Sequence, residues 1–261
     1  MSMSRRQRTR TVRGVQYGVL ALVVAAVAFG ANWGEIRRAF FDVDVAQAQF
    51  PDIITTALVN TVVYTLLGFG FGLALGLILA LMRLSSVPPY RWLATAYIEF
   101  FRGVPALLVF IALGFGVPIA FQVVINQYVT VMLALGLVGA AYMAETIRAG
   151  IQAVPKGQVE AARSLGMSQG RAMRSIVIPQ AFRIVLPPLT NELILLTKDS
   201  SLVYLLGLSL GQYELAKFGR DALNENRSLT PILVAGLCYL IITLPLGHLV
   251  RRLEARTAKA R

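Results

Sequence analysis

The sequence has few of the residues from which catalytic and metal sites are usually built. Its 261 residues include one cysteine, Cys238, and one histidine, His248. A single cysteine excludes an internal disulfide framework and a cysteine metal cluster, and we expect Cys238 to be a buried packing residue. No metal site, no nucleophile–base pair and no glycine-rich phosphate loop with a lysine can be identified. These absences argue against an enzyme and against ATP binding by this chain.

Charge is also scarce. Only 15% of the residues are charged, whereas 56% are hydrophobic. A soluble domain could not bury that much apolar surface, so the composition predicts an all-α integral membrane protein. The net charge of +12 does not indicate nucleic acid binding, because the basic residues are spread over the ends of the apolar segments.

Six apolar segments predict six membrane spans: 15–31, 55–82, 93–121, 128–147, 184–208 and 230–250. Of the 25 Lys and Arg residues, 18 fall in segments that this topology places in the cytosol and five in external segments. This asymmetry predicts that both termini are cytoplasmic. We divide the chain into a basic N-terminus with an anchor helix and external segment (1–52), a core (53–250) and a basic cytosolic tail (251–261). The first span could also be a signal peptide, but Ala28-Phe29-Gly30 is a poor cleavage site, so we favour an uncleaved anchor.

Two pairs of opposite charges stand three residues apart in predicted helices. Glu99 precedes Arg102, and Glu145 precedes Arg148. Residues at this spacing are neighbours on a helix surface, so both pairs are expected to form structural ion pairs. Pro105, just after the first pair, is expected to kink or start a helix.

Glycines recur in the second span at Gly68, Gly72 and Gly76. A four-residue spacing places them on one face, where a neighbouring helix can approach the backbone closely. We interpret this face as a packing seam.

The fifth predicted span is unusually polar for a membrane helix. Its candidate substrate-path residues are Asn191, Glu192, Thr197, Lys198, Asp199, Ser200 and Ser201. Polar groups at membrane depth are costly unless they pair or line water, and the seven-residue spacing places Glu192 and Asp199 on one face. A zwitterionic amino acid needs an acceptor for its ammonium and a donor for its carboxylate, and this face offers both. Asn60 and Thr61 could face the same cavity, and the span could contain a break.

The segment 155–180 is basic and lies between apolar spans. Pro155 suits the start of a short helix, and Gly166 suits the left-handed residue that ends it. Ser168 can cap a second helix, which we expect to stop near Pro179. Ala161 and Ala162 would let a partner surface approach the first helix closely. The segment is therefore predicted to be an exposed, bent helix pair.

This segment resembles the EAA loop of bacterial ABC importer permeases. The residues at the positions of that pattern are Glu160, Ala161, Ala162, Gly166, Ile176 and Pro179, and Ile178 departs from the usual leucine. The stretch from Glu99 to Pro105 is similar to the E-x-x-R-G-x-P segment of the polar amino acid permeases of the histidine, glutamine, glutamate and arginine type. The stretch from Asn191 to Leu202 is similar to the NE…KDSSL run of the same family.

The resemblance covers about residues 53–250 and implies the MetI-like ABC importer fold, a five-helix core to which this chain adds an N-terminal helix. It implies a permease subunit in a bacterial cytoplasmic membrane that forms the path for polar amino acids, either glutamate and glutamine or basic amino acids. The implied partners are a cytosolic ATPase dimer that binds ATP and Mg, an extracytoplasmic solute-binding protein and a second, identical or homologous permease subunit. Residues 155–180, with Glu160, Arg163 and Gly166, would couple to the ATPase. An ion-coupled secondary transporter or channel that uses Glu192, Lys198 and Asp199 as a relay remains the alternative.

Overall fold

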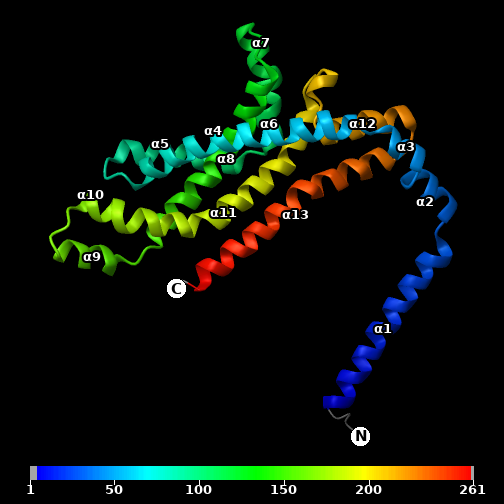
Figure 1. The fold of residues 1–261 in the computed structure, drawn as a ribbon, viewed down its shortest axis with the longest axis horizontal. Coiled ribbons are helices and arrows are strands. Elements are labelled where there is room, and N and C mark those ends of the chain that lie inside the picture. Colours follow the sequence, from blue (N-terminus) through cyan, green and yellow to red (C-terminus); the bar gives the residue numbers. More distant parts are fainter. Residues whose placement is uncertain (1–4, 260–261) are drawn as a thin grey trace.

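The computed structural model describes residues 5–259, and the side chains of residues 11–257. Every regular element in this range is helical, as the composition predicts, and the chain turns back on itself several times (Figure 1). Residues 1–4 and 260–261, which belong to the predicted N-terminal region and C-terminal tail, lie outside the described residues. In chain order the α-helices are α1 (Arg5–Gly30), α2 (Trp33–Phe40), α3 (Val43–Ala48), α4 (Val59–Leu84), α5 (Pro88–Gly103), α6 (Ala106–Ile111), α7 (Val117–Phe121), α8 (Gln127–Gln152), α9 (Lys156–Ser164), α10 (Gln169–Ala172), α11 (Ile178–Asp199), α12 (Leu215–Asn226) and α13 (Thr230–Lys259). The π-helical turns are η1 (Ile53–Leu58), η2 (Ala112–Gly116) and η3 (Met173–Val177), and the 3₁₀ turns are η4 (Ser200–Leu205) and η5 (Leu210–Gln212).

The centre of the fold is the pair α4 and α8, which pack at very short range. A Cβ atom at Gly72 would lie 3.1 Å from the Gly136 carbonyl oxygen, and one at Gly76 would lie 3.0 Å from the Ala140 carbonyl oxygen. Gly68 meets Leu135 of α8 in the same way. The glycine face therefore is a packing seam, as the sequence indicates, because only hydrogen fits where the backbones meet.

The third predicted span is broken at Pro105, as the sequence indicates. α5 ends at Gly103, Pro105 precedes α6, and the two arms are bent by 102°. Pro105 has no amide proton and imposes an extended conformation on the residue before it, so the helix ends and restarts there. As a result α6 turns onto α8, where Phe110 joins the core, and α7 projects at the top of Figure 1.

Four segments are long and apolar enough to cross a membrane: Thr11–Gly30, Ile53–Leu84, Gln127–Gln152 and Thr230–Thr257. The bent pair of α5 with α6 and α7 makes a fifth. α11 is not apolar enough to count by composition, yet it packs against α4, α8 and α13. With α11, the multi-pass arrangement fits the six predicted spans.

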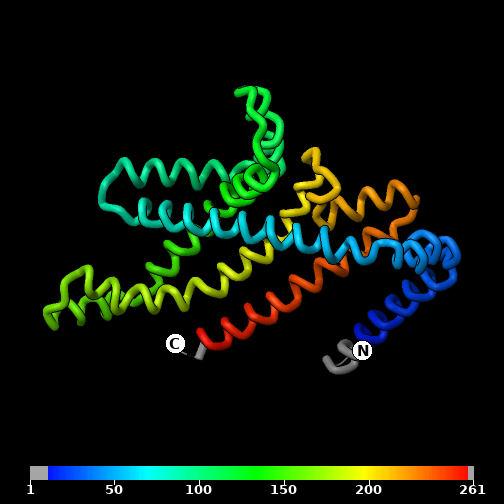
Figure 2. Tube along the Cα trace, turned by 45° about the horizontal axis from the view of Figure 1, so that its top comes forward, coloured from blue at the N-terminus to red at the C-terminus, as the bar shows by residue number. Residues whose placement is uncertain are grey.

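α1 leaves the rest of the molecule (Figure 2). The side chains of its apolar part, Thr11–Gly30, are not buried against other elements. The segment after α1, which is predicted to be external, is held to the start of α13, because the Leu229 amide donates to the Ala39 carbonyl at 2.7 Å and the Asp42 amide to Thr230 Oγ1 at 3.1 Å. At the other end, the predicted tail from residue 251 is not separate from the last span. α13 continues to Lys259 as one helix, since Leu253, Ala255 and Arg256 are good helix formers.

Candidate functional site

The predicted bent helix pair forms α9 and α10, which lie together at one end of the molecule, at the left of Figure 1. Pro155 precedes α9, and Gly166 adopts φ +83°, the left-handed conformation expected of it. The Gly166 amide donates to the Arg163 carbonyl and the Met167 amide to the Ala162 carbonyl. This is a Schellman motif, which ends α9 and turns the chain by local hydrogen bonds alone.

The second helix of the pair does not stop near Pro179, which is a correction of the prediction. Ser168 caps α10, with its Oγ accepting from the Arg171 amide at 3.3 Å. The chain then runs through the π-helical turn η3 directly into α11. Pro179 lies in the first turn of α11, where a proline without an amide proton is tolerated. α10, η3 and α11 thus form one continuous rod.

The outer surface of this segment carries a residue that the sequence pattern did not single out. Glu160, Ala161 and Arg163 are exposed as expected, but Ala162 is buried against the protein, so only one of the two alanines can admit a partner. Leu165, one residue before the turn glycine, is 85% exposed. A large apolar side chain beside a polar face marks a contact surface. Leu165 could have been found as the only large apolar residue between Ala162 and Met167.

The inner surface of the segment is packed onto two other elements. Val154, at the end of α8, Val177 of η3 and Ala181 of α11 form a buried cluster, against which Val159 of α9 packs. Ile176 is half-buried beside them. Packed side chains therefore connect α9 to η3 and to the start of α11, and such contacts can transmit strain because protein interiors resist compression.

One of the two predicted ion pairs forms and the other does not. Arg148 Nη2 lies 2.6 Å from Glu145 Oε2, and Arg83 of α4 approaches the same carboxylate at 3.6 Å. Among the described residues Glu99 has no ion-pair partner, and the Arg102 guanidinium lies 5.7 Å from the centre of the Tyr142 ring. The Glu99–Arg102 prediction is wrong because the α8 ring offers Arg102 a cation–π contact, a partner distant in sequence.

The polar side chains of α11 fall into two groups, one accessible and without hydrogen-bond partners in the described part of the subunit, the other buried and hydrogen-bonded. Asn191 and Lys198 are exposed, and Glu192, Asp199 and Ser201 are half-buried. Within the described residues of this subunit, no hydrogen bond or ion pair engages Asn191, Glu192, Lys198 or Asp199. Charged groups at membrane depth without internal partners must face water, a ligand or another chain.

Thr197 and Ser200 do not belong to that open face. Both are buried, and their hydroxyls donate to the Leu193 and Thr197 carbonyls of their own helix at 2.8 Å and 2.7 Å. The prediction that Thr197 and Ser200 line the substrate path is wrong, because each hydroxyl already donates its hydrogen bond to a carbonyl of the preceding helical turn. The predicted break is present: α11 tightens into the 3₁₀ turn η4 at Ser200.

Asn60 and Thr61 are likewise used within the subunit. Asn60 Nδ2 donates to the Gly211 and Tyr213 carbonyls at 2.9 Å and 3.0 Å, and Thr61 Oγ1 accepts from the Leu215 amide at 3.1 Å. Both side chains are buried. The prediction that they face a cavity shared with α11 is wrong, because the segment after η4 folds back and takes up their hydrogen bonds.

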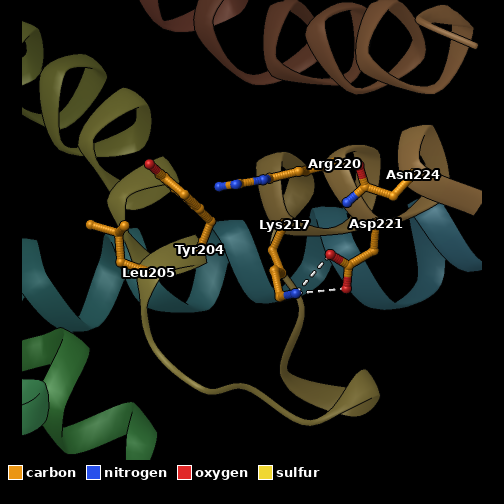
Figure 3. A pocket seen from close by; sticks show the side chains of 6 residues that line it. All are labelled: Tyr204, Leu205, Lys217, Arg220, Asp221 and Asn224. Atoms are coloured by element: carbon orange, nitrogen blue, oxygen red, sulfur yellow. Dashed lines mark hydrogen bonds and ion pairs between the residues drawn. The ribbon is translucent and has the colours of Figure 1, made fainter. Parts of the chain in front are cut away.

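A small pocket of about 350 Å³ lies where η4 meets α12, beyond the end of α11 (Figure 3). Lys217 Nζ binds both oxygens of Asp221 at 2.7 Å and 2.6 Å, and the Arg220 guanidinium lies 4.8 Å from the centre of the Tyr204 ring. Leu205 and Asn224 complete the lining. The sequence indicated only a polar external segment here, since the pocket depends on the fold bringing residues 204 and 220 together.

Comparison with known proteins agrees with this geometry. The family described as "Binding-protein-dependent transport system inner membrane component" matches residues 72–259. The arginine transport system permease protein ArtQ of Bacillus subtilis is 38% identical over 71% of this chain and 83% of its own length. The glutamate/aspartate import permease protein GltK of Escherichia coli is 38% identical over 77% of this chain and 92% of its own length.

Solved structures give the same result for the fold. A crystal structure of an amino acid ABC transporter with histidines superposes with a TM-score of 0.74 at 35% identity, covering 82% of this chain and 98% of that one. An inward-facing form of the MetNI methionine ABC transporter gives a TM-score of 0.58 at 20% identity, over 77% of this chain and 92% of that one. The latter shows the fold alone. The all-α, MetI-like fold is therefore confirmed, and the chain belongs to the family of inner membrane components of binding-protein-dependent transport systems, as a transport subunit of the amino acid ABC permeases.

Proposed function

We propose that α9 and α10 are the element through which a separate ATPase dimer drives this permease, and that the open face of α11 lines the path of a polar amino acid. ATP and Mg bind to the ATPase chain in this scheme. A solute-binding protein delivers the amino acid from outside, and a second permease subunit, identical or homologous, completes the path. The protein resides in a bacterial cytoplasmic membrane with both termini in the cytoplasm, where its basic segments belong.

The observation that carries this proposal is the mechanical connection between the two sites. The exposed residues Glu160 and Arg163 lie on α9 and Leu165 directly follows it. Val159 of α9 packs against the buried cluster of Val154, Val177 and Ala181, which joins α9 to α11. Because α10, η3 and α11 are one rod, a push on the bent pair displaces the polar face as a rigid body. Such a movement switches a transporter between two access states.

The side chains of α11 that have no hydrogen-bond partner within the described residues of the subunit indicate the chemical class of the substrate. Glu192 and Asp199 can accept hydrogen bonds from an ammonium group, and Lys198 can donate to a carboxylate. Asn191 and Ser201 supply neutral polar contacts at the same face. Relatives at 36–38% identity are named for arginine, glutamine and glutamate/aspartate transport. We propose a polar amino acid of that range, held as its zwitterion.

The test replaces Gly166 by arginine in the permease reconstituted with its ATPase and solute-binding protein. At φ +83° a side chain is strained by roughly 1 kcal/mol, and a bulky cation would disturb the contact surface. Uptake should be abolished, while ATP hydrolysis no longer responds to loaded solute-binding protein and membrane insertion is unchanged.

The matched control is Gly170→Arg, which adds the same side chain in open space to α10 without a left-handed backbone. This variant should retain substantial uptake. Normal uptake by Gly166→Arg would contradict the coupling role, and equal loss in both variants would show a charge effect unrelated to the turn.

The second candidate is an ion-coupled carrier, favoured by the unpaired carboxylates of Glu192 and Asp199. It predicts uptake into vesicles that contain this chain alone and an ion gradient. Uptake that needs both ATP and the ATPase would exclude it.

A further inference from the structure

A cavity of about 990 Å³ lies where α9, the first half of α11 and the end of α13 meet. Figure 1 shows the end of α13 next to α11, on the same side as α9. The lining residues are Ala153, Pro155, Gln158, Gln180, Arg183, Ile184, Leu186, Leu253, Arg256 and Thr257. None of the functions assigned above uses this cavity.

The polar part of the lining is suited to an anion. Arg183 and Arg256 are exposed, and within the described residues neither guanidinium forms an ion pair or a hydrogen bond. Among the lining residues that the structure describes, none carries a carboxylate. Two cations left together without a counter-ion repel each other, so a bound anion would stabilise the arrangement.

A third source of positive potential is the start of α9. Pro155 and Gln158 of the lining belong to its first turn, and no side chain caps it. The nine-residue helix therefore presents free amide groups of Lys156 and Gly157 and the positive end of its dipole toward this region. Gln158 itself is held in place by Gln180, whose Nε2 donates to Gln158 Oε1.

The rest of the lining is apolar. Ile184, Leu186 and Leu253 form a wall that a small inorganic anion would leave unused. Arginine beside aliphatic side chains, at the predicted cytosolic end of two spans, suits an amphiphile with a phosphate at its polar end. The volume also exceeds what a phosphate ion needs.

From this combination we propose that the cavity binds an anionic phospholipid, with its phosphodiester between Arg183 and Arg256 and its acyl chains along Ile184, Leu186 and Leu253. Thr257 already joins α13 to α11 through the Arg183 carbonyl at 3.4 Å. The lipid extends this junction to the first turn of α9. The composition of the cytoplasmic leaflet thereby adjusts how freely the bent helix pair moves.

The test measures lipid retention by the full chain, purified with its copurifying subunits from membranes that contain phosphatidylglycerol. Native mass spectrometry should detect retained phosphatidylglycerol. The double variant Arg183→Gln/Arg256→Gln should retain it about 10-fold less, since each basic residue at an anionic surface contributes to lipid binding. The matched control, Arg251→Gln/Arg252→Gln, removes two positive charges from α13 at positions outside the cavity and should retain lipid as the wild type does.

A second variant keeps the charge but fills the space: Ala153→Trp should also lose the lipid. Melting temperatures in phosphatidylcholine nanodiscs show whether each variant is folded. Added phosphatidylglycerol should raise the melting temperature of the wild type but not that of Arg183→Gln/Arg256→Gln. Equal stabilisation by inorganic phosphate without phosphatidylglycerol would assign the cavity to a free anion and overturn the proposal. The proposal would also be overturned if Arg251→Gln/Arg252→Gln lost as much lipid as Arg183→Gln/Arg256→Gln, or if the wild type retained no phosphatidylglycerol.

Discussion

α4 and α11 both carry polar side chains at membrane depth, yet they use them in opposite ways. On α4 every polar group that the sequence singled out, Asn60 and Thr61, is buried and hydrogen-bonded to the segment after η4. On α11, Glu192, Lys198 and Asp199 find no partner in the described residues of the subunit. A buried polar group that is satisfied internally stabilises one conformation, whereas an unsatisfied one at this depth is kept for a ligand or another chain.

The same contrast extends to packing. α4 is fixed to α8 by close backbone approach at Gly72 and Gly76, and Arg83 near the end of α4 adds a charge contact to Glu145. α11 continues into the exposed α9–α10 pair and contains Pro187 and Pro188, which remove amide donors from its helical ladder. In the proposed cycle we therefore expect the α4–α8 pair to be the stationary part and α11 to be the part that moves. Each of the following substitutions challenges this division.

Gly72→Leu should have the largest effect. Its side chain would meet the Gly136 carbonyl and the Ala140 amide, and backbone atoms cannot turn aside as a flexible side chain can. Overpacking of this kind costs about 3 kcal/mol or more, so we expect little folded protein by size-exclusion chromatography after detergent extraction. Gly70→Leu is the control, because nothing lies within 4 Å of that position on the same helix. A well-folded Gly72→Leu protein would mean that α4 and α8 can separate.

A pair of asparagines tests the contrast directly. Asn60→Leu leaves the Gly211 and Tyr213 carbonyls without their donor, which should lower the free energy of unfolding by about 2–4 kcal/mol. Asn191→Leu removes an exposed amide without partners and should leave the melting temperature unchanged while it lowers uptake. Thermal denaturation and uptake measured on both variants separate the two roles. The reverse result would exchange the functions that we assign to the two helices.

Lys198→Met should impair transport without affecting stability. A hydrogen bond to a charged group contributes about 1.5–3 kcal/mol, so uptake in reconstituted vesicles should fall roughly 10- to 100-fold. Lys198→Arg keeps a donor and should recover part of the loss. An unchanged uptake rate in Lys198→Met would remove this ammonium from the substrate path.

The sequence predicts local features of this molecule well. The left-handed Gly166, the Ser168 cap, the break at Pro105 and the glycine seam each follow from a conformational preference or a periodicity of a few residues. The Glu145–Arg148 pair, three residues apart on one helix, was found for the same reason. Such features need no knowledge of the rest of the fold.

Several of the incorrect predictions concern contacts between residues that are far apart in the sequence. Arg102 meets Tyr142, and Asn60 meets Gly211 and Tyr213, across separations that no local pattern encodes. Pro179 did not end a helix because the π-turn before it removed the need for its amide proton. The pocket of Figure 3 and the cavity near Arg183 were not predicted, since each requires elements distant in sequence to meet.

Glu214 extends the contrast to pH, because its carboxylate is buried outside the candidate spans and fastens the external segment. Its oxygens accept from the Ala216 and Lys217 amides at 2.6 Å each and from the Tyr239 hydroxyl at 2.9 Å, and the Tyr64 phenol lies nearby. Burial raises the pKa of this carboxyl to about 7, although the hydrogen bonds act in the opposite direction. A raised pKa means that the folded protein holds a proton that the unfolded chain has released.

The free energy of unfolding should therefore fall as pH rises from about 4.5 to about 7, by at most about 1.4 kcal/mol per pH unit. Glu214→Gln imitates the protonated acid, so its melting temperature should differ less between about pH 5.5 and about pH 7.5 than that of the wild type. Glu225→Gln, on the exposed side of α12, should keep the wild-type dependence. An unaltered pH dependence in Glu214→Gln would show that the hydrogen bonds outweigh burial and that this carboxylate stays ionised, as a fixed part of the stationary frame.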